Sequence, residues 1–594
     1  MGRISLRLFG LLGAGLLALC AAYATLVLSS ATWAEARSLD QVFPFYTWHI
    51  QDFTAQEFAN IRNALAVSAV LLAGISATLA ASRICRQEIS ALAAEVAQSA
   101  KGLLKGLKEL TTAECRVAFW SFVGLTAIRL YFSIYNPEYD DAVSYEVFVS
   151  KGLLATAAYY PIPNNHVFSN TISLLFYQLS PGFWWSMRLP VLLISTAATG
   201  FLFAALLRRA SFVVALVATS LFCWLQLSLY HAGVGRGYWL LIWLAGIVFF
   251  SMVELLAERG RHRAAWASIL VAGVVGCYTI PTFVYVLAST FSWLSLAFLR
   301  RERRGQLVPL IMVGALIGVA TAVLYAPLLL VSGLRIFARN GYVETLAPGV
   351  FWPLLPGYLW HNEGFLAGQR TLGPLITLPV LALIGWMFYQ ARAGKLPANM
   401  AMRLRQVGLP ALWFISLPYA AILVQRVFPP ERVLLYKAFY FFILAGLVVE
   451  WVLWQWPVPA HRWPRRAMLT LAGLFALYET FSVVRVNPTA RGSNANYHAG
   501  LVWLAANPPG RVLIPEPTHN LFFRFYAHTE QRNRNWQIDY QQLGNSRYDY
   551  VVAFPNKRGY FQPKFNFPPV FQNPDVEIYR VPQNYNLQTR AWMR

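Results

Sequence analysis

The sequence predicts a mainly α-helical, polytopic membrane protein with about thirteen transmembrane helices and a small C-terminal α/β domain. Three observations support this fold class. The 594 residues are 57% hydrophobic and only 13% charged, whereas soluble domains carry about 25% charged residues. Apolar stretches of roughly 17 to 25 residues, long enough to cross a bilayer, recur along most of the chain. From about residue 485 onward the sequence is instead polar, aromatic and rich in Asn and Pro.

The loops between the predicted spans carry charges that indicate their side of the membrane. Cytoplasmic loops have an excess of Lys and Arg, and every second loop here is basic, as at Arg208 and Arg209. This alternation predicts a cytoplasmic N-terminus and an extracytoplasmic C-terminal tail, in a multi-pass protein of the cell (inner or plasma) membrane. It also accounts for the net charge of +23, so the lipid bilayer, and not nucleic acid, is the expected partner. The spans lie at about 8–28, 62–82, 116–135, 183–207, 212–230, 236–257, 264–281, 282–299, 307–333, 373–391, 407–427, 433–455 and 467–484.

The chain divides into three predicted parts. Residues 1–115 comprise two transmembrane helices and a basic cytoplasmic segment, whose Lys101, Lys105 and Lys108 share one helical face suited to anionic lipid. Residues 116–484 form a membrane domain. Residues 485–594 form an extracytoplasmic α/β domain, in which a helix is expected at about 496–506 and strands at 510–514, 548–554 and 576–581.

Two adjacent carboxylates, Asp140 and Asp141, lie just past the apolar segment 119–135. Ionised side chains are costly near hydrocarbon, so carboxylates at a membrane boundary indicate a function. Asn165 and His166 belong to the same predicted outer loop. Further polar residues fall in loops on the same predicted side: His231, Arg236, Tyr238, Tyr278, Arg335 and Arg432.

These residue types fit an acid/base and anion-binding site. A carboxylate can take the proton of an attacking hydroxyl, and two neighbouring carboxylates raise each other's pKa. Arginines can hold a phosphate leaving group with paired hydrogen bonds. The five cysteines show no metal-ligand spacing, so no metal site is predicted, and a divalent cation is not indicated as a cofactor.

Each residue also has a purely structural interpretation, and these alternatives stay open at this point. Asp140 and Asp141 could favour the first turn of a loop helix. Arg236 could be an interfacial anchor, and His166 a structural hydrogen-bonding group. Arg432 could form a local ion pair with Glu431.

Several short motifs resemble those of the GT-C class of polytopic glycosyltransferases, in particular the branch of protein O-mannosyltransferases and lipid A aminoarabinose transferase. Residues 139–145 (YDDAVSY) resemble the Asp-Glu motif of the first outer loop, with Asp141 in place of the usual Glu. Residues 163–166 (PNNH) are similar to the stretch that follows it. Further similar segments are RLP at 188–190, GRGY at 235–238, YT at 278–279 and PERVLLY at 430–436.

The resemblance implies a polyprenyl-phosphate-sugar donor, an extracytoplasmic acceptor (a glycan, lipid or protein) and inversion at the anomeric carbon. Residues 116–484 would then be the catalytic membrane domain. Asp140 would be the general base, and Asp141 would support it or contact the acceptor. Donor phosphate is expected at Arg236, Arg432 and Arg335, and substrate at Asn165, His166, His231, Tyr238 and Tyr278.

A membrane carrier or flippase for a lipid-linked sugar or polysaccharide is the alternative function. A carrier should place ionisable groups near the middle of the membrane and often contains an internal repeat. The sequence shows neither clearly, and its ionisable residues gather at the outer boundary. The sequence therefore favours the enzyme.

Overall fold

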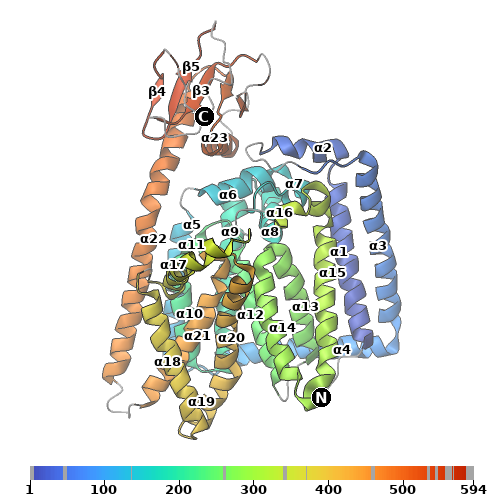
Figure 1. The fold of residues 1–594 in the computed structure, drawn as a ribbon, viewed down its shortest axis with the longest axis vertical. Coiled ribbons are helices and arrows are strands. Elements are labelled where there is room, and N and C mark those ends of the chain that lie inside the picture. The colour runs from blue at the N-terminus through green and yellow to red at the C-terminus, as the bar shows by residue number, and fades with distance from the viewer. Residues whose placement is uncertain are drawn as a thin grey trace.

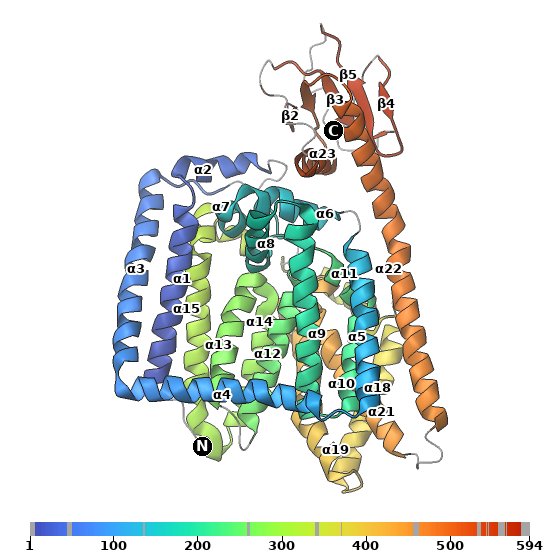
Figure 2. The same ribbon diagram turned by 180° about the vertical axis from the view of Figure 1, so that it is seen from behind.

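The computed structural model shows a helical bundle with a small domain beyond one end (Figures 1 and 2). The residues it describes are 6–43, 50–134, 137–257, 262–338, 344–369, 371–455, 462–530, 536–541, 543, 546–555, 565 and 567–583.

Eleven helices among the described residues are long and apolar enough to cross a membrane, or twelve if one bent pair counts as a single span. This confirms the predicted polytopic helical fold. One further helix, α13 (His262–Thr279), occupies the predicted span 264–281 but is not among the eleven. The eleven include α1 (Leu6–Ser29), α3 (Ala55–Ala81), α5 (Thr112–Ser133), α9 (Leu189–Arg209), α12 (Tyr238–Leu256), α14 (Val284–Phe298), α15 (Leu307–Val331), α18 (Gly373–Arg392), α20 (Leu409–Gln425), α21 (Tyr436–Gln455) and α22 (Arg462–Ala505).

The predicted span 212–230 is not one straight helix. It consists of α10 (Phe212–Trp224) and α11 (Gln226–Gly233), which meet at an angle of 67°. Leu225 between them has a non-helical backbone, with φ −52° and ψ 133°. The Gln226 backbone N–H donates to the Glu479 carboxylate of α22 over 2.5 Å, which satisfies a donor exposed by the break. The bend turns the end of α11 towards the candidate site.

The N-terminal part forms one edge of the bundle, where α1 packs between α3 and α15 (Figure 2). The predicted amphipathic segment is helix α4 (Arg83–Lys108), which confirms its helical structure. It lies across the ends of the other helices, and Arg263 holds it with ion pairs to Glu88 (2.6 Å) and Glu95 (3.0 Å). Lys101, Lys105 and Lys108 are exposed, so contact with anionic lipid stays a prediction for this face.

Short helices gather at the opposite end of the bundle, facing the small domain (Figures 1 and 2). They carry Asp140, Asp141 and Arg335, and Asn165 and His166 lie in the loop just before one of them. These elements are α2 (Trp33–Ser38), α6 (Tyr139–Val143), the π-helical η2 (Ser144–Phe148), η3 (Val149–Lys151), α7 (Leu153–Ala158), α8 (Val167–Leu179), the π-helical η4 (Trp184–Arg188) and α16 (Arg335–Ala338). Two other elements used below are the 20-residue helix α17 (Pro348–Ala367) and the short η8 (Glu431–Leu434), and α19 (Ala398–Arg403) lies at the far end.

The C-terminal domain has a five-stranded sheet in the order β2-β1-β3-β5-β4. Strand β1 (Arg511–Leu513) is parallel to β2 (Gln537–Asp539) and β3 (Tyr550–Ala553), while β5 (Glu577–Arg580) is antiparallel to β3 and β4 (Phe571–Gln572). The three predicted strands correspond to β1, β3 and β5. Short β2 and β4, and helix α23 (Pro517–Thr529), were not predicted, because two or three residues give no pattern and α23 mixes aromatic and polar residues throughout.

Helix α22 joins the membrane region to this domain without a break. It is 44 residues long, or about 66 Å at 1.5 Å per residue, which is about twice the hydrocarbon thickness of a bilayer. The predicted span 467–484 and the predicted helix 496–506 are therefore two parts of one helix. The division at residue 485 lies inside it, and the three-part division of the chain stays a prediction.

We expect Gly373→Ala to destabilise the fold by about 1–3 kcal/mol, the usual cost of overpacking. A Cβ on Gly373 would lie 2.2 Å from the Gly364 backbone nitrogen of α17, and backbone cannot move aside as a side chain can. Gly385→Ala in the same helix α18 is the control, since its Cβ would meet no described atom within 4 Å. Thermal unfolding in detergent would test this, and equal melting temperatures would contradict the tight α17–α18 contact.

Candidate active site

The carboxylate pair lies at the start of α6, and its two members differ in environment. Glu138, and not either Asp, is the N-cap residue of α6, and it makes no side-chain capping bond. Both Asp residues therefore occupy the first turn, where the helix dipole favours negative charge. The Asp140 side chain is 42% exposed, whereas that of Asp141 is fully buried. Only Asp140 is accessible to a substrate.

Asp141 forms a buried ion pair with Arg188, which ends η4. The Arg188 Nη2 to Asp141 Oδ2 distance is 2.5 Å, and the Arg188 side chain is 2% exposed. Arg188 also donates from Nη1 to the Gly233 carbonyl at the end of α11, over 2.5 Å. Burial raises the pKa of Asp141, and the Arg188 charge and the Gly235 backbone amide oppose that rise. One guanidinium thus joins α6, η4 and α11.

Asp140 faces a second arginine, Arg236, which follows α11. The Arg236 Nη2 to Asp140 Oδ2 distance is 3.7 Å. The Arg236 side chain is only 3% exposed and donates from Nη1 to the Asn164 backbone carbonyl (3.1 Å) and to its side-chain carbonyl. Asn164 in turn donates from Nδ2 to the Asp140 backbone carbonyl over 3.1 Å. Arg236 and Asn164 therefore hold Asp140 from both its side chain and its backbone.

The glycines beside Arg236 allow this close packing. A Cβ on Gly237 would lie 3.0 Å from both the Ser169 Cβ and the Thr279 Cγ2. A Cβ on Gly235 would lie 3.0 Å from the Met187 Cβ. These distances are shorter than ordinary side-chain contacts, so the Gly-Arg-Gly sequence lets the arginine backbone lie directly against α8, α13 and η4.

His166 lies between Arg236 and the backbone that follows it. The Gly237 N–H donates to Nδ1 over 2.9 Å, and Arg236 Nη2 is 3.2 Å from Nε2. A neutral imidazole accepts a hydrogen bond at one nitrogen only, so one of these contacts is not a hydrogen bond. Burial, followed by the charges of Arg236, His231 and Arg432, lowers the pKa of His166 well below its usual value. His166 is therefore neutral in the folded protein.

Tyr238 and His231 complete this cluster. The Tyr238 ring lies edge-on to His166, with centroids 4.8 Å apart, and 4.2 Å from the His231 ring. His231 Nδ1 and Arg236 Nε are buried and have no hydrogen-bond partner among the described residues. A buried polar atom without a partner calls for an explanation, and a bound ligand would supply one.

The structure brings together Asp140, Asp141, Arg236, His166, His231 and Tyr238. Arg432, in η8, is partly buried, and its charge acts on His166. Glu431, the ion-pair partner that the structural interpretation suggested for Arg432, lies 2.8 Å from His361 Nε2.

Three other predicted site residues do not belong to this cluster. Asn165 is buried and donates to the Thr156 and Tyr159 carbonyls, which fixes the loop. Tyr278 is buried against Tyr23 and Tyr325. Arg335 is exposed at the start of α16 and, within the described residues, makes no ion pair with this cluster.

Sequence reasoning had not assigned a role to Arg188 or Asn164. Both lie inside motifs that carried the resemblance, in RLP at 188–190 and PNNH at 163–166. An arginine at the start of an apolar span is an available signal, but its partner cannot be read from the sequence. No group of three His, Cys, Asp or Glu side chains in the described parts of the chain could hold a metal ion.

Comparison with known proteins gives matches only at the level of structure. No family model and no curated protein matches the sequence. The structure is similar to ArnT from Cupriavidus metallidurans, solved with bound undecaprenyl phosphate and in the apo state. For both, the TM-score is 0.52 with 13% sequence identity, over 80% of this chain and 100% of that one. The chain has the GT-C fold. The predicted fold resemblance is confirmed, and at this identity the comparison speaks for the fold alone.

We expect Asp141→Asn and Arg188→Gln each to destabilise the GT-C fold by about 3–5 kcal/mol, because each leaves a buried charge without its partner. The double variant should lose less than the sum of the two single losses, since neither charge then remains. A double-mutant cycle of thermal stability would measure this coupling. Additive losses would contradict the buried pair.

Proposed function

We propose that this protein is a glycosyltransferase that moves a sugar from a polyprenyl-phosphate donor to an extracytoplasmic acceptor. In the proposed reaction Asp140 is the general base that accepts the proton of the attacking acceptor hydroxyl. The phosphate end of the donor is the leaving group, and attack from the opposite side inverts the anomeric carbon. The acceptor is a glycan, a lipid or a protein.

The observation that carries this proposal is the position of Asp140 against Arg236. Asp140, Asn164, His166 and residues 236–238 are far apart in sequence, yet they form one cluster with a single partly exposed carboxylate. An exposed carboxylate held by buried donors suits a base that must meet its substrate in a fixed geometry. The fold adds support, because ArnT has been solved with undecaprenyl phosphate.

The geometry also suggests how the remaining residues divide the work. Arg236 is almost fully buried and contacts three residues, Asp140, Asn164 and His166, so it is better suited to orienting Asp140 than to reaching the donor. Arg432 is partly exposed on a separate element, and we assign it to the donor phosphate. Asp141 is buried with Arg188, which favours support of Asp140 over contact with the acceptor.

One observation favours the carrier as a second candidate. Lys437 of α21 is 1% exposed, and its Nζ is 3.9 Å from the Glu363 carboxylate of α17. Ionisable residues within membrane-spanning helices are typical of transport pathways, and Lys437 lies in such a helix, whereas α17 is not among the eleven spans. The pair is not part of the Asp140 cluster. The pair could not be predicted from the sequence, because Glu363 and Lys437 lie in separate segments of the chain.

We expect Asp140→Asn to lower sugar transfer by about 10²–10⁴-fold, the usual contribution of a positioned general base. The substitution keeps the size of an exposed side chain, so the melting temperature should change little. Transfer from a labelled polyprenyl-phosphate sugar in purified membranes would measure the effect.

Equal transfer by the wild type and Asp140→Asn would remove Asp140 from the mechanism. If neither transfers sugar but both move labelled lipid across liposomes, the carrier is supported. In that case Lys437→Met should stop the movement, because it removes the buried charge.

Orientation can be tested by labelling from one side of the membrane. We propose that the α6 end of the bundle is extracytoplasmic. Asp52, whose side chain is 100% exposed, lies just before α3 at that end, and Lys105, 76% exposed, lies on α4 at the other. In a Cys115→Ser background, Asp52→Cys should react with an impermeant maleimide in intact cells, and Lys105→Cys only after permeabilisation. The reverse pattern would place the site in the cytoplasm.

A further inference from the structure

We propose that the C-terminal domain is a working part of the site, because it clamps both ends of the helical segment that carries Asp140. In this proposal Glu146 is a positioning residue that holds the segment against α23. The inference rests on the proposed function for its catalytic consequence, while the clamp itself is a matter of structure.

The segment that bears Asp140, residues 139–148, is one continuous helical rod. Helix α6 continues without a break into η2, and the junction residues Val143, Ser144 and Val149 all have helical backbone angles. Asp140 and Glu146 lie less than about 10 Å apart along this rod at helical rise. A displacement of one end is therefore passed on to Asp140.

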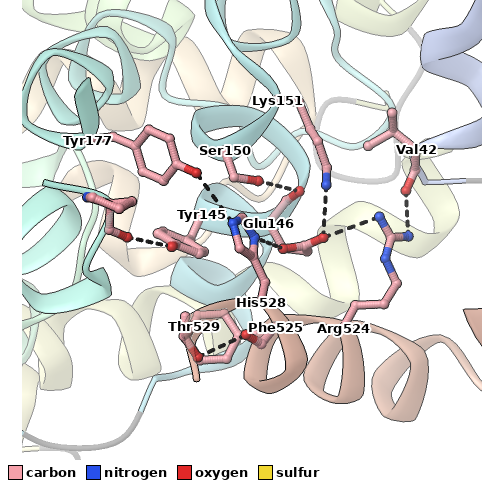
Figure 3. A network of polar contacts seen from close by, with 11 residues as sticks. Val42, Tyr145, Glu146, Ser150, Lys151, Tyr177, Arg524, Phe525, His528 and Thr529 are labelled. Atoms are coloured by element: carbon pink, nitrogen blue, oxygen red, sulfur yellow. Dashed lines mark hydrogen bonds and ion pairs between the residues drawn. The ribbon is translucent and has the colours of Figure 1, made fainter. Parts of the chain in front are cut away.

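Glu146 connects the rod to the C-terminal domain (Figure 3). Its side chain is 4% exposed and faces two residues of α23, with Arg524 Nη2 at 3.3 Å and His528 Nδ1 at 3.0 Å. Lys151 Nζ, from η3, donates to the same carboxylate over 3.1 Å. Tyr177 of α8 reaches the other His528 nitrogen at 3.3 Å. Removing charged partners from a buried carboxylate is costly, so this contact favours one docked position of α23.

The charges around Glu146 keep it ionised. Burial alone would raise its pKa, but the hydrogen bond with His528 and the charges of Lys151, Arg524 and His528 lower it to about 2. Its stabilising contribution is fully present above the ordinary Glu pKa of 4.5 and is lost as the pH falls towards 2. The Glu146 carboxylate therefore stays ionised across neutral pH.

The other end of the rod is held by α22. Asn494 is 4% exposed, and its Nδ2 donates to the Pro137 carbonyl over 2.5 Å. Pro137 comes two residues before α6. The C-terminal part of the chain thus contacts the rod on each side of Asp140, once from α22 and once from α23.

Helix α23 also contacts the N-terminal part of the chain. Arg524 Nη1 donates to the Val42 carbonyl over 2.9 Å, as Figure 3 shows. Residues 1–115, to which the sequence assigned no role, therefore share an anchor with the rod. The clamp joins all three predicted parts of the chain at the side of the bundle that holds Asp140.

Glu146→Gln tests the clamp, with Glu530→Gln as the matched control. Glu530 also forms a His–Glu contact, 2.5 Å from His498 Nε2. Both of these residues belong to α22 and the C-terminal domain, so their contact does not include the rod. Hydrogen exchange of amides 139–148 and steady-state transfer kinetics are measured for both variants in lipid nanodiscs. We expect Glu146→Gln to speed exchange at least tenfold and to lower kcat at least tenfold, because small misplacements of a catalytic group are costly. The donor KM should stay within about twofold, since Arg432 lies on another element.

Asn494→Ala releases the opposite end of the rod and should give the same split between kcat and KM, which keeps the test decisive if Glu146→Gln does not fold. Exchange or kcat equal to that of Glu530→Gln in both variants would overturn the proposal. If the wild type transfers no sugar, the proposed function fails by itself. The clamp is then decided by exchange alone, and unchanged exchange refutes it.

Discussion

The buried ion pair between Asp141 and Arg188 is the interaction on which the site depends. A guanidinium and a carboxylate that are both almost fully removed from solvent are stable only as partners. Because Arg188 also binds the Gly233 carbonyl, the pair fixes the first loop helix against the end of α11. Arg236, which contacts Asp140, follows Gly233 by only three residues. The exposed carboxylate therefore owes its place to the hidden one beside it.

This division explains why two adjacent acids have different environments. Helical geometry turns neighbouring side chains about 100° apart, so one faces the bundle and the other faces the open side. The inward acid, Asp141, is buried in an ion pair with Arg188, while the outward acid, Asp140, stays partly exposed. The buried member of an adjacent carboxylate pair can thus anchor its exposed neighbour.

The membrane fold could be predicted from sequence because apolar stretches and loop charges are local signals. What the sequence could not provide depends on distant partners. The bend at Leu225 relies on Glu479, about 250 residues further on, and nothing near Leu225 announces it. Arg129 and Lys437 lay within spans taken as plain apolar helices. Arg129 is satisfied there by the Ser195 carbonyl and the Thr199 hydroxyl of α9. Asp140, His166 and Arg236 were predictable as a set because loops on one side of a bundle gather together, whereas Arg335 lies in such a loop and still stands apart from them.

The unbroken course of α22 has a consequence for how the protein responds to its surroundings. A stiff helix that crosses the hydrocarbon and continues into the C-terminal domain acts as a lever. Bilayers that are thinner or thicker than its apolar section change its tilt, and the lever arm carries that change outward to α23. We therefore expect bilayer thickness to alter the spacing between the C-terminal domain and α6.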